Sequence, residues 1–214
     1  IVPDSKYLVS YGDMDPAVAA PYACSGLTAF SALKKIPDTL SEDWIIIFGA
    51  GGVGINGILL SSAVHKAKIL VIDNNKEKRD KAIEAGAHAA FSPDEEEKIR
   101  NIVGIGASAA IDFVGMPETT DLALSLVKKG GMVVVIGLYG GSLKLSLPLV
   151  PMRSITLRGS YVGELRELRE LVDIIKSGTI KLMPVKRQDL STANQAMSDL
   201  RAGKVNGRIV LIPN

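Results

Sequence analysis

The chain has 214 residues, with 47% hydrophobic and 22% charged side chains, as expected of one globular domain or of one domain with an additional fragment. Its 25 basic and 23 acidic residues nearly balance, which argues against a nucleic-acid or polybasic membrane partner. One cysteine excludes an intrachain disulfide, one cysteine and two histidines nearly exclude a self-contained Cys/His zinc site, and no apolar run approaches the length of a membrane span.

The first predicted element is a tightly packed helical stretch over residues 15–35, where small side chains recur at close spacing. After it, short β-rich runs alternate with helix-like stretches. The runs cover residues 44–48, 68–72, 109–114, 132–136 and 154–157, and the helical stretches cover 53–66, 76–85, 95–103 and 118–128. The runs are apolar almost throughout, as in parallel strands with helices on both faces. We therefore predict a doubly wound parallel α/β domain, a Rossmann fold, over residues 33–157.

The two ends of the sequence differ from this pattern. Residues 158–214 predict one helix over 164–176, a polar loop, a second helix over 192–202 and a terminal strand over 208–212. Residues 1–32 and 158–214 are interpreted as remnants of a second lobe. Because the sequence begins with Ile1 rather than Met, we expect it to be a piece of a longer protein.

A glycine-rich loop is the strongest motif in the sequence. It fits the pattern G-x-G-x-x-G, directly follows the predicted strand 44–48 and opens the next helix. The loop consists of Gly49, Ala50, Gly51, Gly52, Val53 and Gly54. In this pattern the first glycine permits a tight turn, the second lets the backbone approach a pyrophosphate, and the third lets helix and strand pack closely. The helix N-terminus then supplies an anion site.

An acidic residue stands at the end of the next predicted strand. Asp73 follows Gly54 by 19 residues, at the position where a carboxylate accepts hydrogen bonds from the ribose hydroxyls of adenosine. A carboxylate there repels a 2′-phosphate, which favours NAD over NADP. The alternative is that Asp73 only caps the strand end. Lys78 is a candidate contact to the same ribose, or else a solvated helix lysine.

Several ordered segments resemble the zinc-dependent alcohol dehydrogenases of the medium-chain dehydrogenase/reductase family, and together they cover essentially the whole chain. The segments are residues 15–29 around Pro21-Tyr22-Ala23-Cys24-Ser25-Gly26, the glycine loop, residues 73–87, residues 158–163 and residues 207–213. The resemblance implies binding of NAD and, in the complete protein, a catalytic zinc. Cys24 stands where the family has one zinc ligand; the remaining ligands would lie upstream of this sequence.

The inventory of side chains limits what this sequence provides. There is no second cysteine, and His65 and His88 are expected to be structural or surface residues. The chain as given is therefore not expected to assemble a zinc site or to be active alone. The alternative for Cys24 is a small buried hydrophobic side chain.

The resemblance also implies contacts to the nicotinamide end of the coenzyme. Thr28 would face the ring, and Arg208 would pair with the pyrophosphate, although a surface cation is an equal reading of Arg208. The backbone at Ile136, Gly137 and Leu138, together with Ser160 and Val162, would hold the carboxamide. Residues 158–163 resemble an edge strand through which such enzymes dimerise.

The implied reaction is reversible oxidation of an alcohol to an aldehyde or ketone with hydride transfer to NAD, zinc acting as a Lewis acid on the alcohol. No secretory signal or membrane segment is visible, and we expect a cytoplasmic protein. The resemblance of residues 158–163 to a dimerising edge strand implies a homodimer or homotetramer. Two other readings stay open. One is a zinc-free quinone or enoyl reductase of the same family, which Cys24 and Asp73 disfavour. The other is a non-catalytic module that senses NAD(H).

Overall fold

The computed structural model describes residues 4–205 and 207–213. Its main sheet has six parallel strands in the order β3-β2-β1-β4-β5-β6. The strands are β1 (Trp44–Phe48), β2 (Lys68–Ile72), β3 (Ala89–Phe91), β4 (Ala107–Asp112), β5 (Val127–Val135) and β6 (Thr156–Gly159). This order places the topological switch point between β1 and β4, as in dinucleotide-binding domains. The predicted doubly wound parallel sheet is confirmed.

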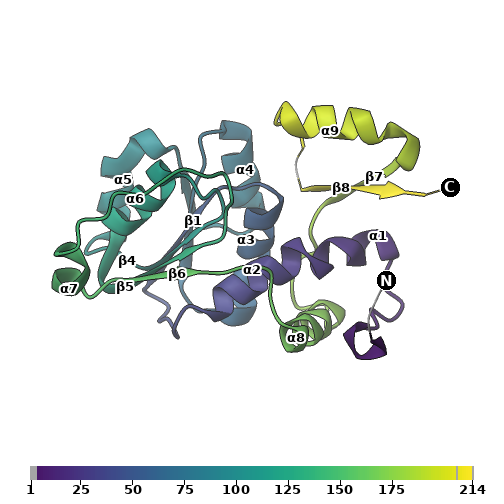
Figure 1. Cartoon of the computed structure of the whole chain (residues 1–214), viewed down its shortest axis with the longest axis horizontal. Coiled ribbons are helices and arrows are strands. Elements are labelled where there is room, and N and C mark those ends of the chain that lie inside the picture. Colours follow the sequence, from purple (N-terminus) through teal and green to yellow (C-terminus); the bar gives the residue numbers. More distant parts are fainter. Residues whose placement is uncertain (1–3, 206, 214) are drawn as a thin grey trace.

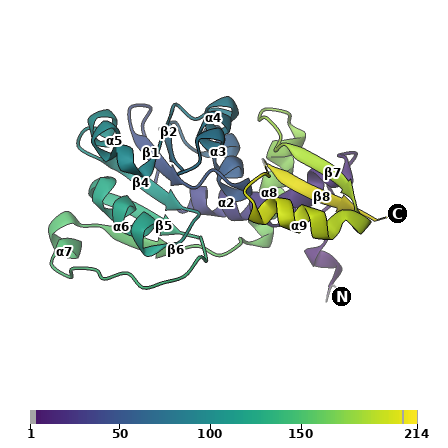
Figure 2. The same ribbon diagram turned by 90° about the horizontal axis from the view of Figure 1, so that it is seen from above.

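Helices cover both faces of this sheet (Figure 2). On one face lie α2 (Ser25–Lys34), α3 (Gly52–Val64), α4 (Lys76–Ala85) and α8 (Leu165–Lys176); on the other lie α5 (Glu96–Val103) and α6 (Pro117–Leu126). Along β1, Ile45 and Ile47 pack into the first core, whereas Ile46 and Phe48 pack into the second. The uninterrupted apolar sequence of the strand therefore follows from burial on both sides.

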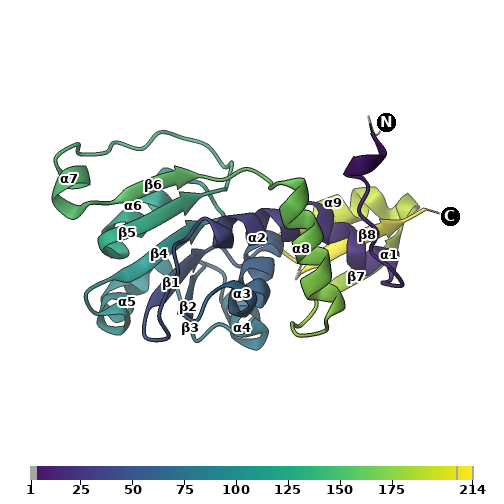
Figure 3. The same cartoon turned by 90° about the horizontal axis from the view of Figure 1, so that it is seen from below.

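A smaller unit lies at the far side of the molecule from α7 (Leu149–Arg153) (Figures 1 and 3). It pairs β7 (Val185–Asp189) with β8 (Arg208–Ile212) in parallel, and η4 (Leu190–Thr192) and α9 (Ala193–Arg201) connect the two strands. The N-terminal elements are η1 (Ser5–Tyr7), α1 (Pro16–Ala19) and η2 (Ala20–Ala23), of which α1 contacts β7 and η2 contacts β8.

Most predicted elements exist, and their bounds differ for physical reasons. The bounds of β1, β2, α4 and β8 are those predicted. Strand β4 ends two residues early because the Asp112 carboxylate accepts hydrogen bonds from the backbone N–H groups of Val114 and Gly115 and so turns the chain. The predicted polar loop before residue 192 is wrong over Val185–Asp189, where a mostly polar sequence forms β7.

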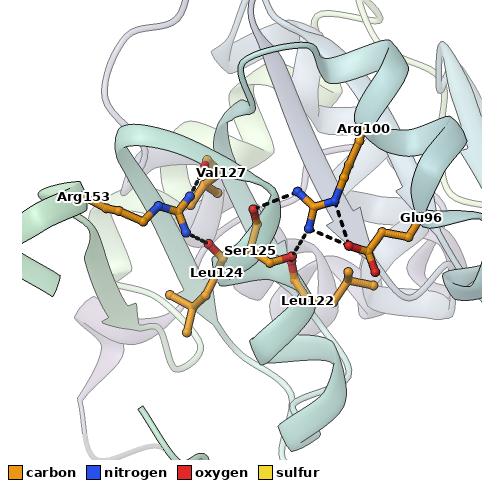
Figure 4. Close-up of polar contacts among 7 residues, drawn as sticks. All are labelled: Glu96, Arg100, Leu122, Leu124, Ser125, Val127 and Arg153. Atoms are coloured by element: carbon orange, nitrogen blue, oxygen red, sulfur yellow. Dashed lines mark hydrogen bonds and ion pairs between the residues drawn. The ribbon is translucent and has the colours of Figure 1, made fainter. Parts of the chain in front are cut away.

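The transition from α6 to β5 also differs from the prediction. The helix ends at Leu126, and β5 begins at Val127, so Gly130 and Gly131 lie in a bulge where the β4–β5 register shifts rather than before the strand. The last carbonyls of α6 accept hydrogen bonds from two arginines (Figure 4). Arg153 donates to the carbonyls of Leu124 and Val127, and Arg100 donates to the carbonyl and the hydroxyl of Ser125. Guanidinium groups at this helix end favour its termination there.

Two elements cross the points where the sequence suggests domain boundaries. Helix α2 spans residues 32 and 33, and β6 spans residues 157 and 158. The division into 1–32, 33–157 and 158–214 remains a prediction, and its outermost residues, 1–3 and 214, lie outside the described part. Across the described residues, every helix is too short or too polar to cross a bilayer.

Candidate coenzyme cleft

The glycine loop connects the end of β1 to the start of α3, as predicted. Gly49 has φ +87°, a left-handed conformation that favours glycine. A Cβ atom on Gly54 would lie 1.8 Å from the carbonyl oxygen of Gly49, so only glycine permits this close packing. Around Gly51, by contrast, the corresponding position is open. The loop thus leaves space beside the N-terminus of α3, where backbone N–H groups and the helix dipole favour an anion.

Asp73 directly follows β2 and lies beside this loop. One carboxylate oxygen accepts a hydrogen bond from Ala50 N at 2.8 Å, and the other accepts one from Asn75 N at 2.8 Å. The residue is 9% exposed and borders the cleft described below. Asp73 therefore does cap the strand end, and it also fixes the loop. A carboxylate offers about four acceptor positions, so these two bonds leave it able to accept from a ligand.

A cleft of about 530 Å³ opens along the carboxyl ends of β1, β2 and β4. From the predicted coenzyme residues it brings together Gly49, Gly51, Gly52, Val53, Gly54, Asp73, Lys78 and Arg208. Ala50 belongs to the same loop and contributes its backbone N–H to Asp73. Ligands of open α/β sheets bind at this edge, next to the switch point.

Arg208 reaches the cleft from β8, far along the sequence. Its side chain lies over the start of α3, close enough that a Cβ atom on Gly52 would meet Nε at 2.5 Å. The Nε group is buried and has no hydrogen-bond partner. Burial lowers the pKa of Arg208 below its ordinary value, an effect that the nearby Cys24 partly opposes. An unpaired cation at a helix N-terminus is suited to an anionic ligand.

Cys24 precedes α2 and lies in a neighbouring pocket of about 420 Å³ that Arg208 also borders. Its thiol is exposed, so the interpretation as a buried hydrophobic side chain is wrong. Thr28, one turn further on, is buried and donates a hydrogen bond to the carbonyl of Cys24 at 2.7 Å. In the described part of the chain, no three His, Cys, Asp or Glu side chains are grouped closely enough to hold a metal ion.

The two histidines make structural contacts, as expected. His65 is buried at the end of α3, where its ring nitrogens lie 2.9 Å from the carbonyl oxygen of Leu33 and 3.3 Å from the hydroxyl of Thr39. The Nδ1 atom of His88 accepts a hydrogen bond from Ile69 N. Both side chains are therefore occupied in holding neighbouring elements.

The residues predicted to hold the carboxamide follow β5 and β6. None of Ile136, Gly137, Leu138, Ser160 and Val162 is among the described residues that line the cleft. Ser160 is buried, and its hydroxyl has no partner. Val162 has a left-handed φ of +50°, and Leu138 is largely exposed.

Sequence reasoning missed Asp112, which was placed inside a strand. It is fully buried and accepts four hydrogen bonds, from the N–H groups of Val114 and Gly115 and from the hydroxyls of Thr119 and Thr120. A carboxylate that interrupts the otherwise apolar run of residues 109–114 is the signal that would have found it.

Comparison with known proteins agrees with this geometry. Residues 52–177, more than half of the chain, match the family of zinc-binding dehydrogenases. The chain belongs to this family. It is 34% identical to an NAD-dependent alcohol dehydrogenase of Sulfolobus acidocaldarius over 99% of this chain, and 33% identical to the D-arabinose 1-dehydrogenase (NADP(+)) of Saccharolobus solfataricus over 100% of it. The chain spans 62% of the length of each relative.

Solved structures show the same relationship. The alcohol dehydrogenase of Aeropyrum pernix superimposes with a TM-score of 0.85 at 30% identity, covering 94% of this chain and 60% of that one. The acetophenone reductase of Geotrichum candidum, solved in complex with NAD, gives a TM-score of 0.82 at 26% identity, covering 95% of this chain and 58% of that one. The resemblance predicted from the sequence is confirmed.

Proposed function

We propose that this chain is the coenzyme-binding portion of an NAD-dependent alcohol dehydrogenase of the zinc type. The observation that carries the proposal is the cleft in which the glycine loop, Asp73 and the unpaired Arg208 lie together. An NAD-dependent alcohol dehydrogenase among the relatives supports the reaction class, oxidation of a small alcohol to an aldehyde or ketone.

The residues of the cleft suit two parts of NAD, the charged pyrophosphate and the polar adenosine ribose. Backbone N–H groups at the start of α3 and the Arg208 guanidinium would bind the pyrophosphate. Asp73 would accept hydrogen bonds from the adenosine ribose, with Lys78 beside it. Because one relative uses NADP, the choice of coenzyme rests here on the charge of Asp73.

The nicotinamide half would lie toward α2 and the ends of β5 and β6. Thr28 would face the ring, and the backbone of Ile136–Leu138 with Ser160 and Val162 would hold the carboxamide. The unpartnered hydroxyl of buried Ser160 supports this placement, since buried polar groups normally have a partner. These contacts would fix which face of the ring receives hydride.

Zinc, when bound, would act as a Lewis acid on the alcohol. The described residues of this chain do not make such a site by themselves, because Cys24 is the single candidate ligand and both histidines are occupied. Cys24 would be one ligand of a site completed by residues that this chain does not contribute. This chain alone is therefore proposed to bind coenzyme without turning over alcohol.

We further propose that the protein is cytoplasmic and assembles as a homodimer or homotetramer. Among the described strands, β6 stands at an edge of the main sheet, and all four of its residues are exposed. An unpaired edge strand is a common place for pairing with a second copy.

Calorimetric titration of the chain with NAD and, in parallel, NADP tests the proposal. Preference for NAD is the expected result, and preference for NADP would overturn the role given to Asp73. Absence of binding to either coenzyme by a chain that melts cooperatively would contradict the interpretation of the cleft. Alcohol-dependent NAD reduction by the complete protein tests the reaction class separately.

A further inference from the structure

Asp112 is a fully buried carboxylate whose four hydrogen-bond donors are neutral. The two backbone bonds measure 2.9 Å, and the two threonine bonds measure 2.8 Å. Burying a carboxylate is costly unless its lone pairs are satisfied, so all four donors contribute to holding it. Their own positions are in turn fixed by the carboxylate.

The four donors all come from the turn between β4 and α6 or from the first turn of α6. This turn forms a wall of the coenzyme cleft, which Val114, Met116 and Thr119 line. Thr119 also accepts a hydrogen bond from Met116 N at 3.1 Å. The buried side chain of Asp112 therefore holds this wall in place by hydrogen bonds, although Asp112 is not among the described residues that line the cleft.

The turn transmits this order to two other segments of the cleft. Val114 packs on the first glycine of the loop, because a Cβ atom on Gly49 would lie 2.8 Å from Val114 Cγ2. Gly115 lies against Gly137, whose carbonyl oxygen would be 1.9 Å from a Cβ atom on Gly115. The carbonyl of Asp112 also accepts hydrogen bonds from the N–H groups of Ile136 and Gly137.

We propose that Asp112 is a positioning residue that sets the shape of the coenzyme cleft, holding the β4–α6 turn against the glycine loop and against the segment after β5. The inference rests on the proposed function, since it concerns how the same cleft binds NAD. Asp73 and Asp112 then divide two tasks. Asp73 borders the cleft and contacts the ligand, whereas Asp112 acts only through the turn.

The contacts at the two ends of α6 support the positioning role of Asp112. At its start, Thr119 and Thr120 bind Asp112 beside the cleft. At its end, on the opposite edge of the sheet, Arg100 and Arg153 bind its last carbonyls (Figure 4). With its far end anchored, α6 cannot shift freely to compensate for loss of the carboxylate.

The test compares NAD affinity, measured by calorimetry, with the melting temperature in three variants of this chain. Asp112→Ala leaves two N–H groups and two hydroxyls without their acceptor, and we expect it to weaken NAD binding about tenfold or more. Asp112→Asn retains one oxygen for the backbone N–H groups, and the threonine hydroxyls can turn to accept from its amide. We therefore expect the asparagine variant to recover NAD affinity to within about threefold of the original chain.

Ser108→Ala is the matched control for general loss of stability. Ser108 lies on the same strand but donates to Asp43 at the other edge of the sheet, so its variant should melt earlier and bind NAD unchanged. The proposal would be overturned if Asp112→Ala bound NAD like the original chain, or if Asp112→Asn bound it as weakly as the alanine variant. If the original chain binds NAD but Asp112→Ala does not fold, NAD binding by the Thr120→Val variant tests the positioning role instead.

Thr120 is buried and does not belong to the described lining of the cleft, so its valine variant removes one donor from Asp112 at nearly constant shape. We expect NAD affinity to fall about threefold. Unchanged affinity would overturn the positioning role. Absence of NAD binding by the original, folded chain would instead contradict the proposed function, so the two failures are distinguishable.

Discussion

Two carboxylates at opposite ends of the strands of the main sheet, Asp43 at the amino ends (the amino edge) and Asp73 at the carboxyl ends (the carboxyl edge), are used in opposite ways. At the amino edge, Asp43 accepts hydrogen bonds from Lys128 Nζ at 2.7 Å, Ser108 Oγ at 2.5 Å and Leu40 N at 2.9 Å. At the carboxyl edge, the carboxylate of Asp73 is bound only by backbone N–H groups in the described contacts, and Arg208 Nε has no partner. Polar groups that serve stability are paired with one another, whereas those at the cleft are left able to bind a ligand.

The glycine loop gives the largest expected effect, and two substitutions there separate folding from binding. Gly54→Ala forces a Cβ atom against the backbone of Gly49, and we expect it to reduce the free energy of unfolding by about 3 kcal/mol or more. Gly51→Ala meets open space and should change stability by no more than about 0.5 kcal/mol while still weakening NAD binding. Chemical denaturation and NAD titration check both. Equal destabilisation by the two variants would contradict the distinction.

Substitution of Arg208 should weaken NAD binding without lowering stability. Arg208→Gln removes the unpaired cation beside α3, so NAD affinity should fall about tenfold, as expected for loss of a charged hydrogen bond worth about 1.5 kcal/mol or more. Because burial already lowers the pKa of Arg208 and so disfavours its charge, the melting temperature should not fall. Arg187→Gln, on the adjacent strand, makes the same change in net charge and should leave NAD affinity unchanged.

Asp43 tests the amino edge, where stability should change without binding. Burial tends to raise its pKa, but hydrogen bonds from Lys128, Ser108 and Leu40 outweigh this and lower the pKa from 3.8 to about 2. Asp43→Asn should cost about 2 kcal/mol of stability at neutral pH and leave NAD affinity unchanged.

The pH dependence follows from the direction of that shift. Because the folded-state pKa of Asp43 is depressed, its contribution is fully present above the unfolded-state pKa and is lost as pH falls toward about 2. The stability difference between the original chain and Asp43→Asn should therefore shrink below pH 3.8. A constant difference across the acid range would show that the charge of Asp43 is not what stabilises the edge.

The sequence predicts this molecule well where one local pattern determines one feature. The apolar runs predict the parallel sheet because burial on both faces requires apolar residues throughout. One helix and one parallel strand, α3 and β2, separate the glycine loop from Asp73, so their spacing predicts that they meet at the carboxyl ends of neighbouring strands. Asp112 was missed because the bonds that matter to it come from a turn whose conformation the apolar pattern does not encode. Strand β7 was missed because its pairing with β8 is not visible in a polar sequence.

Asp73 should control the choice between the coenzymes more than affinity itself. Asp73→Asn keeps an acceptor for one of the two backbone N–H groups but removes the charge that repels a 2′-phosphate. We expect the ratio of NAD affinity to NADP affinity to fall about tenfold, a change of 1.4 kcal/mol. Parallel titrations of both coenzymes measure it. An unchanged ratio would mean that Asp73 serves only as the cap of β2.

The smallest expected effects concern helix α6, which runs between the amino and carboxyl edges of the sheet and so allows both to be compared within one helix. Arg153 donates to the carbonyls of Leu124 and Val127 at the amino edge, so Arg153→Ala should cost about 1 kcal/mol of stability. Arg100→Ala should cost less, because its side chain is 47% exposed and its pair with Glu96 is solvated. Neither variant should change NAD affinity in titration, although both act on the helix that Thr119 and Thr120 hold beside the cleft. A loss of affinity from either would show that the far end of α6 also positions the cleft, and that the two edges are coupled through this helix.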